Sequence, residues 1–139
     1  SLISNIGDDN LIGAKGKDTL SSGNGRDTLW GGNDNDVLRG RGGNDILIGG
    51  NNSDLLDGGI GDDTLDGHNG KDIFVLKSDA GSDTIVDFEL GSDRLGLANG
   101  LQFDDLSFAN NTILVGEKVL ATLNGINTEQ LTSSNFKTI

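Results

Sequence analysis

The chain has 139 residues, a net charge of −12, 23 Gly, five Phe and one Trp, and it lacks Cys, Pro and Met. Large apolar side chains supply most of the free energy of burial, so their scarcity argues against an ordinary hydrophobic core. The acidity excludes nucleic acid as a partner, because phosphates require Lys and Arg, and the lack of Cys excludes disulfides and thiolate metal sites.

The first region, residues 4 to 75, repeats with a period of nine. When each unit is numbered so that Asp occupies position 6, an apolar residue follows at position 8. Position 4 is Gly except for Asp34 and Asn52, which are the residue types that best tolerate a positive φ after Gly, so we predict a left-handed backbone there. The apolar residues are Leu11, Leu20, Leu29, Leu38, Leu47, Leu56, Leu65 and Phe74.

Each unit consists of a turn-forming half and a strand-forming half. Positions 1 to 6 hold turn formers, and positions 7 to 9 are long enough for a very short strand. Side chains alternate across a strand, so position 8 points to one side and positions 7 and 9 point to the other. A three-residue strand is not stable alone, but stacked copies would bury a ladder of Leu side chains.

The repeated pattern Gly-Gly-x-Gly-x-Asp-x-Leu-x resembles the RTX (repeats-in-toxin, hemolysin-type) calcium-binding nonapeptide of secreted bacterial proteases, lipases, toxins and adhesins. The resemblance covers eight tandem copies, just over half of the chain. It implies an all-β, right-handed parallel β-roll, which is a β-solenoid of two sheets with two nonapeptides in each turn. We therefore expect the calcium-binding β-roll at residues 1–75 and a mainly β C-terminal cap at residues 76–139.

In such a roll each loop lies over the loop two units away, so the aspartates form two columns. Like charges about 5 Å apart cost a few kcal/mol even at an effective dielectric of roughly 20. A divalent cation would turn this repulsion into attraction, and oxygen ligands in flexible Gly loops favour Ca²⁺ over Mg²⁺. The alternative is a solvated acidic face of Asx turns without ions. One column holds Asp9, Asp27, Asp45 and Asp63, and the other holds Asp18, Asp36, Asp54 and Asp72.

The resemblance also implies the ligands of each site. The lower loop contributes its Asp and the carbonyl oxygens of positions 2 and 4, and the upper loop contributes its Asp and the carbonyl oxygens of positions 1 and 3. About six or more Ca²⁺ ions are therefore expected, and Asp83, Asp87 or Asp93 could bind more. The six sites are Asp9/Asp27 with Asn5, Gly7, Ser22 and Asn24; Asp18/Asp36 with Ala14, Gly16, Gly31 and Asn33; Asp27/Asp45 with Gly23, Gly25, Gly40 and Gly42; Asp36/Asp54 with Gly32, Asp34, Gly49 and Asn51; Asp45/Asp63 with Arg41, Gly43, Gly58 and Ile60; and Asp54/Asp72 with Gly50, Asn52, Gly67 and Asn69.

After Val75 the period breaks, and the following segment resembles the one that follows the last repeat in many RTX proteins. Phe74, Ile85 and Phe88 are candidates for closing the Leu ladder, because the ends of solenoids need caps. Residues 112–115 and 118–123 predict a hairpin, and Asn127 or Thr128 could cap a helical turn. Residues 135–139 resemble the apolar-ended tail of proteins exported by type I secretion.

Three other features of the sequence lie outside the columns. Ile12, Trp30, Ile46 and Ile48 would form an exposed apolar stripe, either covered by the cap or a neighbouring domain or free to bind a partner. His68, the only His, is interpreted as a tolerated substitution at position 2 rather than a ligand or base. Asp104 and Asp105 are interpreted as a surface turn rather than an acid–base pair, so no catalytic site is predicted.

These patterns predict a calcium-binding module of a larger secreted bacterial protein, disordered in a low-calcium cytosol and folded outside the cell. Its expected partners are calcium ions, other domains of the parent protein and a type I secretion apparatus, and no run is apolar enough for a transmembrane segment. One alternative is an adhesive or partner-binding scaffold. Another is an accessory domain of a secreted hydrolase or epimerase whose active site lies upstream.

Overall fold

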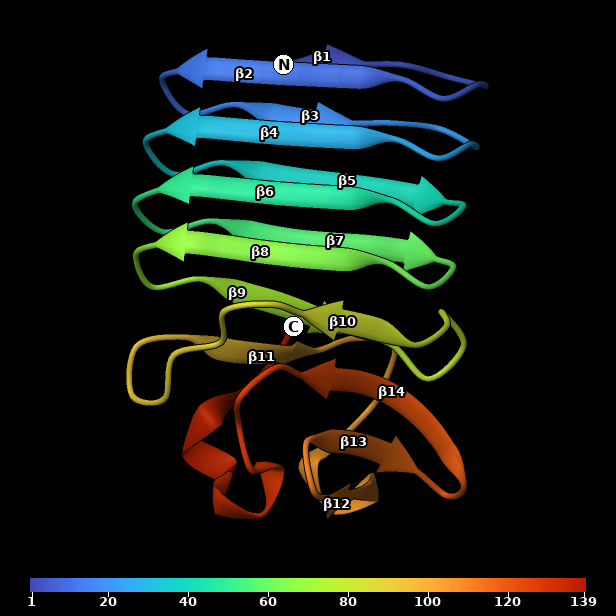
Figure 1. Cartoon of the computed structure of the whole chain (residues 1–139), viewed down its shortest axis with the longest axis vertical. Helices are drawn as coiled ribbons and strands as arrows, with labels where there is room; N and C mark the ends of the chain where they lie inside the picture. Colours follow the sequence, from blue (N-terminus) through green and yellow to red (C-terminus); the bar gives the residue numbers. More distant parts are fainter.

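A computed structural model describes all 139 residues, and its strands from β1 to β11 form a β-solenoid in which successive strands alternate between two sheets (Figure 1). The seven-stranded sheet has the order β1-β3-β5-β7-β9-β11-β15, and the eight-stranded sheet has the order β12-β13-β14-β10-β8-β6-β4-β2. The strands are β1 (Leu2–Ile3), β2 (Asn10–Lys15), β3 (Thr19–Ser21), β4 (Thr28–Asn33), β5 (Val37–Gly42), β6 (Ile46–Asn51), β7 (Leu55–Ile60), β8 (Thr64–Asn69), β9 (Ile73–Leu76), β10 (Asp83–Ile85), β11 (Arg94–Leu97), β12 (Leu106–Ala109), β13 (Thr112–Val115), β14 (Lys118–Leu123) and β15 (Phe136–Thr138).

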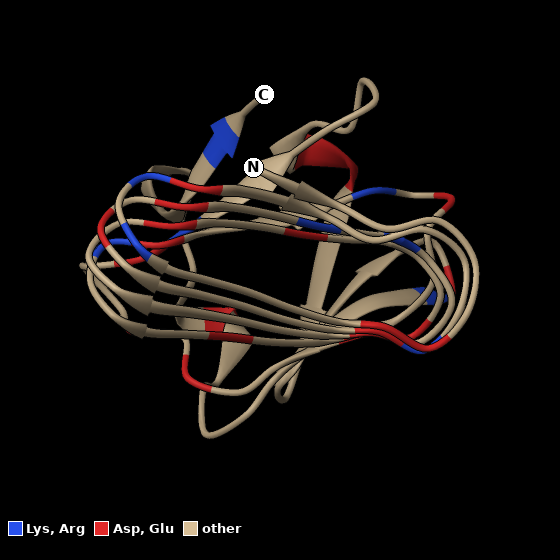
Figure 2. Ribbon diagram, turned by 90° about the horizontal axis from the view of Figure 1, so that it is seen from above, with Lys and Arg blue, Asp and Glu red and all other residues tan.

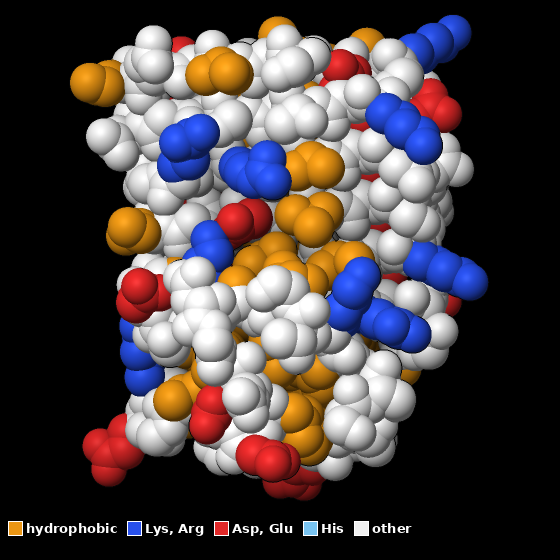
Figure 3. All heavy atoms as spheres, turned by 180° about the vertical axis from the view of Figure 1, so that it is seen from behind, with side chains coloured by type: hydrophobic (Ala, Val, Ile, Leu, Met, Phe, Trp, Pro, Cys, Tyr) orange, Lys and Arg blue, Asp and Glu red, His pale blue; other side chains and the backbone are white.

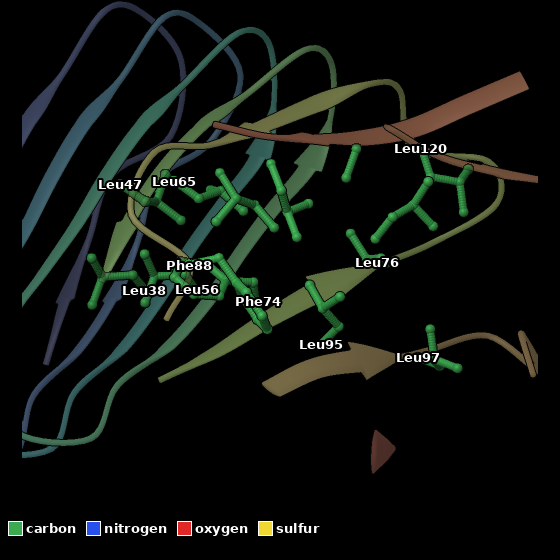
Figure 4. Packing of buried hydrophobic residues seen from close by; sticks show 14 of the residues in the cluster. Leu38, Leu47, Leu56, Leu65, Phe74, Leu76, Phe88, Leu95, Leu97 and Leu120 are labelled. Atoms are coloured by element: carbon green, nitrogen blue, oxygen red, sulfur yellow. The ribbon is translucent and has the colours of Figure 1, made fainter. Parts of the chain in front are cut away.

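The register between neighbouring strands is 18 residues throughout the repeats. Leu11 pairs with Leu29, Leu29 with Leu47 and Leu47 with Leu65, all in parallel. Every position-8 side chain is buried, and Leu20 through Phe74 are fully inaccessible to solvent. The close-up in Figure 4 shows the ladder continuing from Leu38 and Leu47 to Phe74 and on to Leu95. The predicted all-β parallel roll with a Leu ladder is therefore confirmed.

Most strands of the repeats are longer than predicted. They contain six residues and extend from position 7 of one unit to position 3 of the next, because backbone hydrogen bonds continue between turns beyond position 9. The left-handed backbone predicted at position 4 is confirmed, including Asp34 (φ 76°) and Asn52 (φ 75°). Position 2 is left-handed in most units as well, including Arg41 and His68, which was not predicted.

The C-terminal region continues the same two sheets but not the regular coil. β10 and β11 pair in parallel with β8 and β9, whereas β13 and β14 form the predicted antiparallel hairpin. Short 3-10 turns complete the region at η1 (Phe103–Asp105), η2 (Thr128–Gln130) and η3 (Ser133–Asn135), and the Asn127 side chain caps η2 as expected. None of these helical turns has the length or apolarity needed to cross a bilayer.

The ladder ends on aromatic and aliphatic side chains from this region. Phe74, Ile85 and Phe88 are buried in one cluster with the Leu residues, as predicted for residues that close the ladder. The rings of Phe74 and Phe88 lie 6.2 Å apart. The repeats and the C-terminal region therefore share one continuous core.

Candidate metal centres

The structure brings the repeated aspartates together as two columns along the roll. Viewed along the stack in Figure 2, acidic segments of successive turns superpose at the ends of the flattened coil. Each pair is held in the same way: the backbone N–H of the lower Asp donates to Oδ1 of the Asp one turn later. These N···O distances are 2.7–2.8 Å from Asp9/Asp27 through Asp54/Asp72.

The second oxygen of these carboxylates has no donor. The Oδ2 atoms of Asp27, Asp36, Asp45, Asp54 and Asp63 are buried and have no hydrogen-bond partner. Buried polar atoms are almost always paired, because leaving one unpaired costs about 1–3 kcal/mol. A run of five such oxygens at equivalent positions therefore points to a partner that is not a protein group.

Glycine at position 1 leaves room beside four of these oxygens, whereas the unit of Asp27 has Ser22 at that position. A Cβ atom placed on Gly31 would lie 2.5 Å from Asp36 Oδ2 and 2.6 Å from the carbonyl oxygen of Gly49 in the next turn. A Cβ atom placed on Gly13 would likewise lie 3.0 Å from Asp18 Oδ2 and 2.5 Å from the carbonyl oxygen of Gly31. Carboxylate and carbonyl oxygens thus converge without a donor between them, which suits a hard cation.

The remaining carbonyls predicted as ligands lie between the same turns. The position 4 carbonyl of Gly7 faces Gly25 one turn later, and the position 2 carbonyl of Ala14 faces Gly32. At position 3, the carbonyl of Asn24 accepts a 2.9 Å hydrogen bond from the N–H of Gly7. A carbonyl oxygen has a second lone pair, so this bond leaves capacity for a cation. The ligand sets themselves stay a prediction.

Burial makes the charged form of these carboxylates unfavourable. Desolvation is the largest cause, and neighbouring carboxylates in the column add to it although backbone N–H donors oppose it. The pKa of Asp54 and Asp63 rises to about 6, and that of Asp72 to about 7. The pKa values of Asp36 and Asp45 are raised for the same reasons.

The chain's own cations do not neutralise the columns. Among its ion pairs, only the N-terminal amine reaches a column carboxylate, with 3.4 Å between Ser1 N and Asp18 Oδ1. On the back of the roll, several Lys and Arg side chains lie near apolar side chains (Figure 3). Lys77 Nζ lies 2.6 Å from Asp57 Oδ1, which is outside the columns.

Both columns extend into the C-terminal region. Asp63 N–H donates to Asp83 Oδ1 at 3.1 Å, and Asp72 N–H donates to Asp93 Oδ1 at 3.0 Å. Asp83 and Asp93 are buried, and burial raises the pKa of Asp83 to about 7. The sequence suggested these residues only as loose alternatives, because the spacing from the preceding column residue is 20 and 21 instead of 18. Both nevertheless keep the Gly two residues before Asp, in Gly81-Ser82-Asp83 and Gly91-Ser92-Asp93.

The other candidate residues lie apart from the columns. Asp87, the third of the loose alternatives, accepts N–H bonds from Gly67 and His68 instead of joining a column. Asp104 and Asp105 are exposed in η1, where Asp105 Oδ2 accepts a hydrogen bond from Gln102 N–H, as expected for a surface turn.

The apolar stripe lies on the outer face of the eight-stranded sheet. Ile12, Trp30 and Ile46 are exposed and Ile48 is half-buried, so the C-terminal region does not cover the stripe. Covering by the cap, one of the two interpretations given above, is therefore wrong for these exposed side chains. A neighbouring domain or a partner stays a prediction.

Comparison with known proteins identifies the repeat. The family model described as the RTX calcium-binding nonapeptide repeat (4 copies) matches residues 3–38 and again residues 39–74, together more than half of the chain. No curated protein matches the sequence. Among solved structures, the extracellular lipase LipA from Serratia marcescens is similar, with 17% identity and a TM-score of 0.47 over 97% of this chain. The chain spans 38% of the length of that lipase.

Proposed function

Because the chain belongs to the family of RTX calcium-binding nonapeptide repeats, we propose that residues 1–75 become ordered on binding Ca²⁺ and act as a stabilising and secretion module of a larger protein. RTX repeats bind calcium and are typical of secreted proteins. The observation that carries the proposal is the run of buried carboxylate oxygens without donors, of which Asp36 Oδ2 faces a carbonyl oxygen of the next turn.

We assign one site to each pair of aspartates that are adjacent in a column between Asp9 and Asp72, with the carbonyl ligands predicted above. Ca²⁺ bound there would neutralise the facing carboxylates and link successive turns. Asp63/Asp83 and Asp72/Asp93 provide two further carboxylate pairs with the same hydrogen-bond pattern. These two pairs would bind further ions where the module of residues 1–75 meets the C-terminal region.

The residues of the repeats explain why order would depend on the ion. Glycine loses more conformational entropy on folding than any other residue, and each unit buries only one large apolar side chain in the ladder. The columns add repulsion and desolvation of buried carboxylates. In a low-calcium cytosol these costs would keep the repeats disordered, which suits passage through a type I secretion apparatus. Outside the cell, the free energy of ion binding would become free energy of folding.

An RTX roll is a structural domain and not a catalytic one. We propose that, if the parent protein is a hydrolase or an epimerase, its active site lies in another domain. The exposed row of Ile12, Trp30 and Ile46 supports a second candidate function as a partner-binding scaffold.

The proposal is tested by far-UV circular dichroism of the full chain in chelator, in Ca²⁺ and in Mg²⁺. We expect a spectrum of disordered chain in chelator and β-structure in Ca²⁺, with Mg²⁺ much less effective at the same concentration because it retains its waters. Calorimetric titration would give the number of ions. Identical spectra in chelator and in Ca²⁺ would contradict the proposal.

A further inference from the structure

A second group of metal-binding side chains lies where the repeats meet the C-terminal region. Asp66, His68 and Asp87 place one ligand atom each within 4.8 Å of one another. Asp66 and His68 belong to β8, and Asp87 follows β10. Asp66 occupies position 9 of its unit and Asp87 stands outside both columns, so this group is separate from the predicted calcium sites.

The group forms because the parallel ladder stops at this point. β10 ends at Ile85 and pairs with β8 only at Thr64 and Leu65. The next N–H groups of β8 therefore find a side chain instead of a strand: Gly67 N–H donates to Asp87 Oδ1 at 2.9 Å, and His68 N–H donates to Asp87 Oδ2 at 2.6 Å. These bonds fix the Asp87 carboxylate, and each of its oxygens keeps a lone pair free.

The His68 imidazole lies beside the carboxylates of this group. His68 Nδ1 lies 2.6 Å from Asp66 Oδ1, and the backbone of His68 is left-handed, with φ of 65°. In the preceding turn, the residues in register with Asp66 and His68 are Ile48 and Gly50, so the arrangement occurs only once in this sheet. Two carboxylates facing one imidazole form a ligand set for a transition ion such as Zn²⁺, whereas Ca²⁺ prefers oxygen ligands alone.

We propose that Asp66, His68 and Asp87 bind Zn²⁺ or a similar transition ion, and that this ion links the last repeat to the C-terminal region. Two ligands come from β8 and one from the segment that leaves the roll, so binding holds that segment against the end of the ladder. The donors lie slightly closer together than ligands around one ion, and a small rotation of the exposed His68 ring opens the group. Water would complete the coordination shell.

The test uses the full chain saturated with Ca²⁺ and titrated with Zn²⁺ alone. Because His68 is the only His, its imidazole signals in NMR spectra report on this site without ambiguity. We expect one equivalent of Zn²⁺ to shift or broaden them. His68→Gly restores the residue most common at position 2 and should lower Zn²⁺ affinity by more than about tenfold, since even supporting contacts of metal ligands are worth about 10- to 100-fold.

Asp104→Asn is the control, because it removes the charge of an exposed carboxylate in η1 that belongs neither to this group nor to a predicted calcium site. It should leave Zn²⁺ binding unchanged. Asp66→Asn, which keeps the imidazole and the fold of β8, should weaken Zn²⁺ binding while calcium-dependent circular dichroism stays as in the parent chain. Imidazole signals that do not respond to Zn²⁺, or equal affinity in His68→Gly, would overturn the proposal. Either result would leave the calcium proposal intact, because that proposal is judged on spectra without Zn²⁺.

Discussion

The repeats and the C-terminal region share two sheets and one core, but they satisfy their buried polar groups differently. In the C-terminal region the buried Thr128 hydroxyl donates to the carbonyls of Asn110 and Thr112 at 3.1 and 2.8 Å. In the repeats, buried aspartates such as Asp36 and Asp45 keep one oxygen without any donor. Thr128 therefore finds its partners within the chain, whereas the oxygens of the repeats are those that the proposed calcium sites would use.

The apolar cores of the repeats and of the C-terminal region also differ. The C-terminal region packs Phe103, Phe108 and Phe136 with ring centroids 5.1–6.0 Å apart, whereas the repeats contribute one Leu per unit. Aromatic side chains bury more area than Leu and add favourable ring contacts. If the proposed sites bind calcium, the two sheets are stabilised by ions in the repeats and by side-chain packing in the C-terminal region.

The largest expected effect is the response of the repeats to pH without calcium. A carboxyl whose pKa is raised on folding contributes stability below its unfolded pKa of about 3.8, and loses it as pH rises through the folded pKa. The folded pKa is about 6 for Asp54 and Asp63 and about 7 for Asp72 and Asp83. In chelator, the repeats should therefore gain β-structure as pH falls from about 7 towards 4.

With calcium the slope should have the opposite sign, because protons compete with the ion for ionised ligands. Circular dichroism across this pH range, in chelator and in saturating Ca²⁺, measures both slopes. Hydrogen exchange read region by region would show whether the gain in chelator lies in β4 to β8. A loss of order on acidification in both conditions would show that the buried carboxylates do not control folding.

The second prediction concerns a single aspartate of one column. Asp45 belongs to two predicted sites, Asp27/Asp45 and Asp45/Asp63, so Asp45→Asn should weaken both and remove up to two bound ions. Asn can still accept the 2.8 Å hydrogen bond from Asp27 N–H, so the loop geometry is retained. In chelator the same change removes a buried like charge and should stabilise the fold. Native mass spectrometry in calcium and urea unfolding in chelator measure the two effects.

Asp105→Asn is the control in the C-terminal region, where the exposed Asp105 side chain accepts a hydrogen bond within η1. It should change neither the ion count nor the response to chelator. An unchanged ion count in Asp45→Asn would contradict the shared-ligand arrangement of the columns.

The sequence predicted the repeat region more fully than the junction, for identifiable reasons. The strict period of nine, together with the two units per turn that the RTX resemblance implies, placed Asp9 through Asp72 in two columns and Leu11 through Phe74 in the ladder. Strand length was not predictable from positions 7 to 9, since the ladder extends through turn-forming residues whose hydrogen bonds depend on the neighbouring turn. The places of Asp83 and Asp93 in the columns were not predicted firmly, because short insertions change the spacing before them. The place of Asp87 was not predicted, because its contact with β8 exists only where β10 ends early.

The smallest expected effect compares one glycine from each region. Gly31→Ala would place a methyl group 2.5 Å from Asp36 Oδ2 and 2.6 Å from the Gly49 carbonyl oxygen, without a left-handed backbone at that position. Overpacking of this kind costs about 1–3 kcal/mol, and here it also displaces predicted ligands. Gly116→Ala in the β13–β14 turn meets no atom within 4 Å, so its cost is the left-handed backbone alone, about 1–2 kcal/mol at φ of 59°.

The two variants should lower stability in calcium by similar amounts but differ in calcium titrations. Gly31→Ala should move the folding midpoint to a higher Ca²⁺ concentration and reduce cooperativity along its column, because Asp36 is shared by two sites. Gly116→Ala should lower the thermal midpoint at every Ca²⁺ concentration, since no predicted ligand lies near its methyl group. If both variants shifted the calcium midpoint equally, the space beside Gly31 would have no special relation to the ion. These two glycines would then not differ as expected if ions stabilise the repeats and side-chain packing stabilises the C-terminal region.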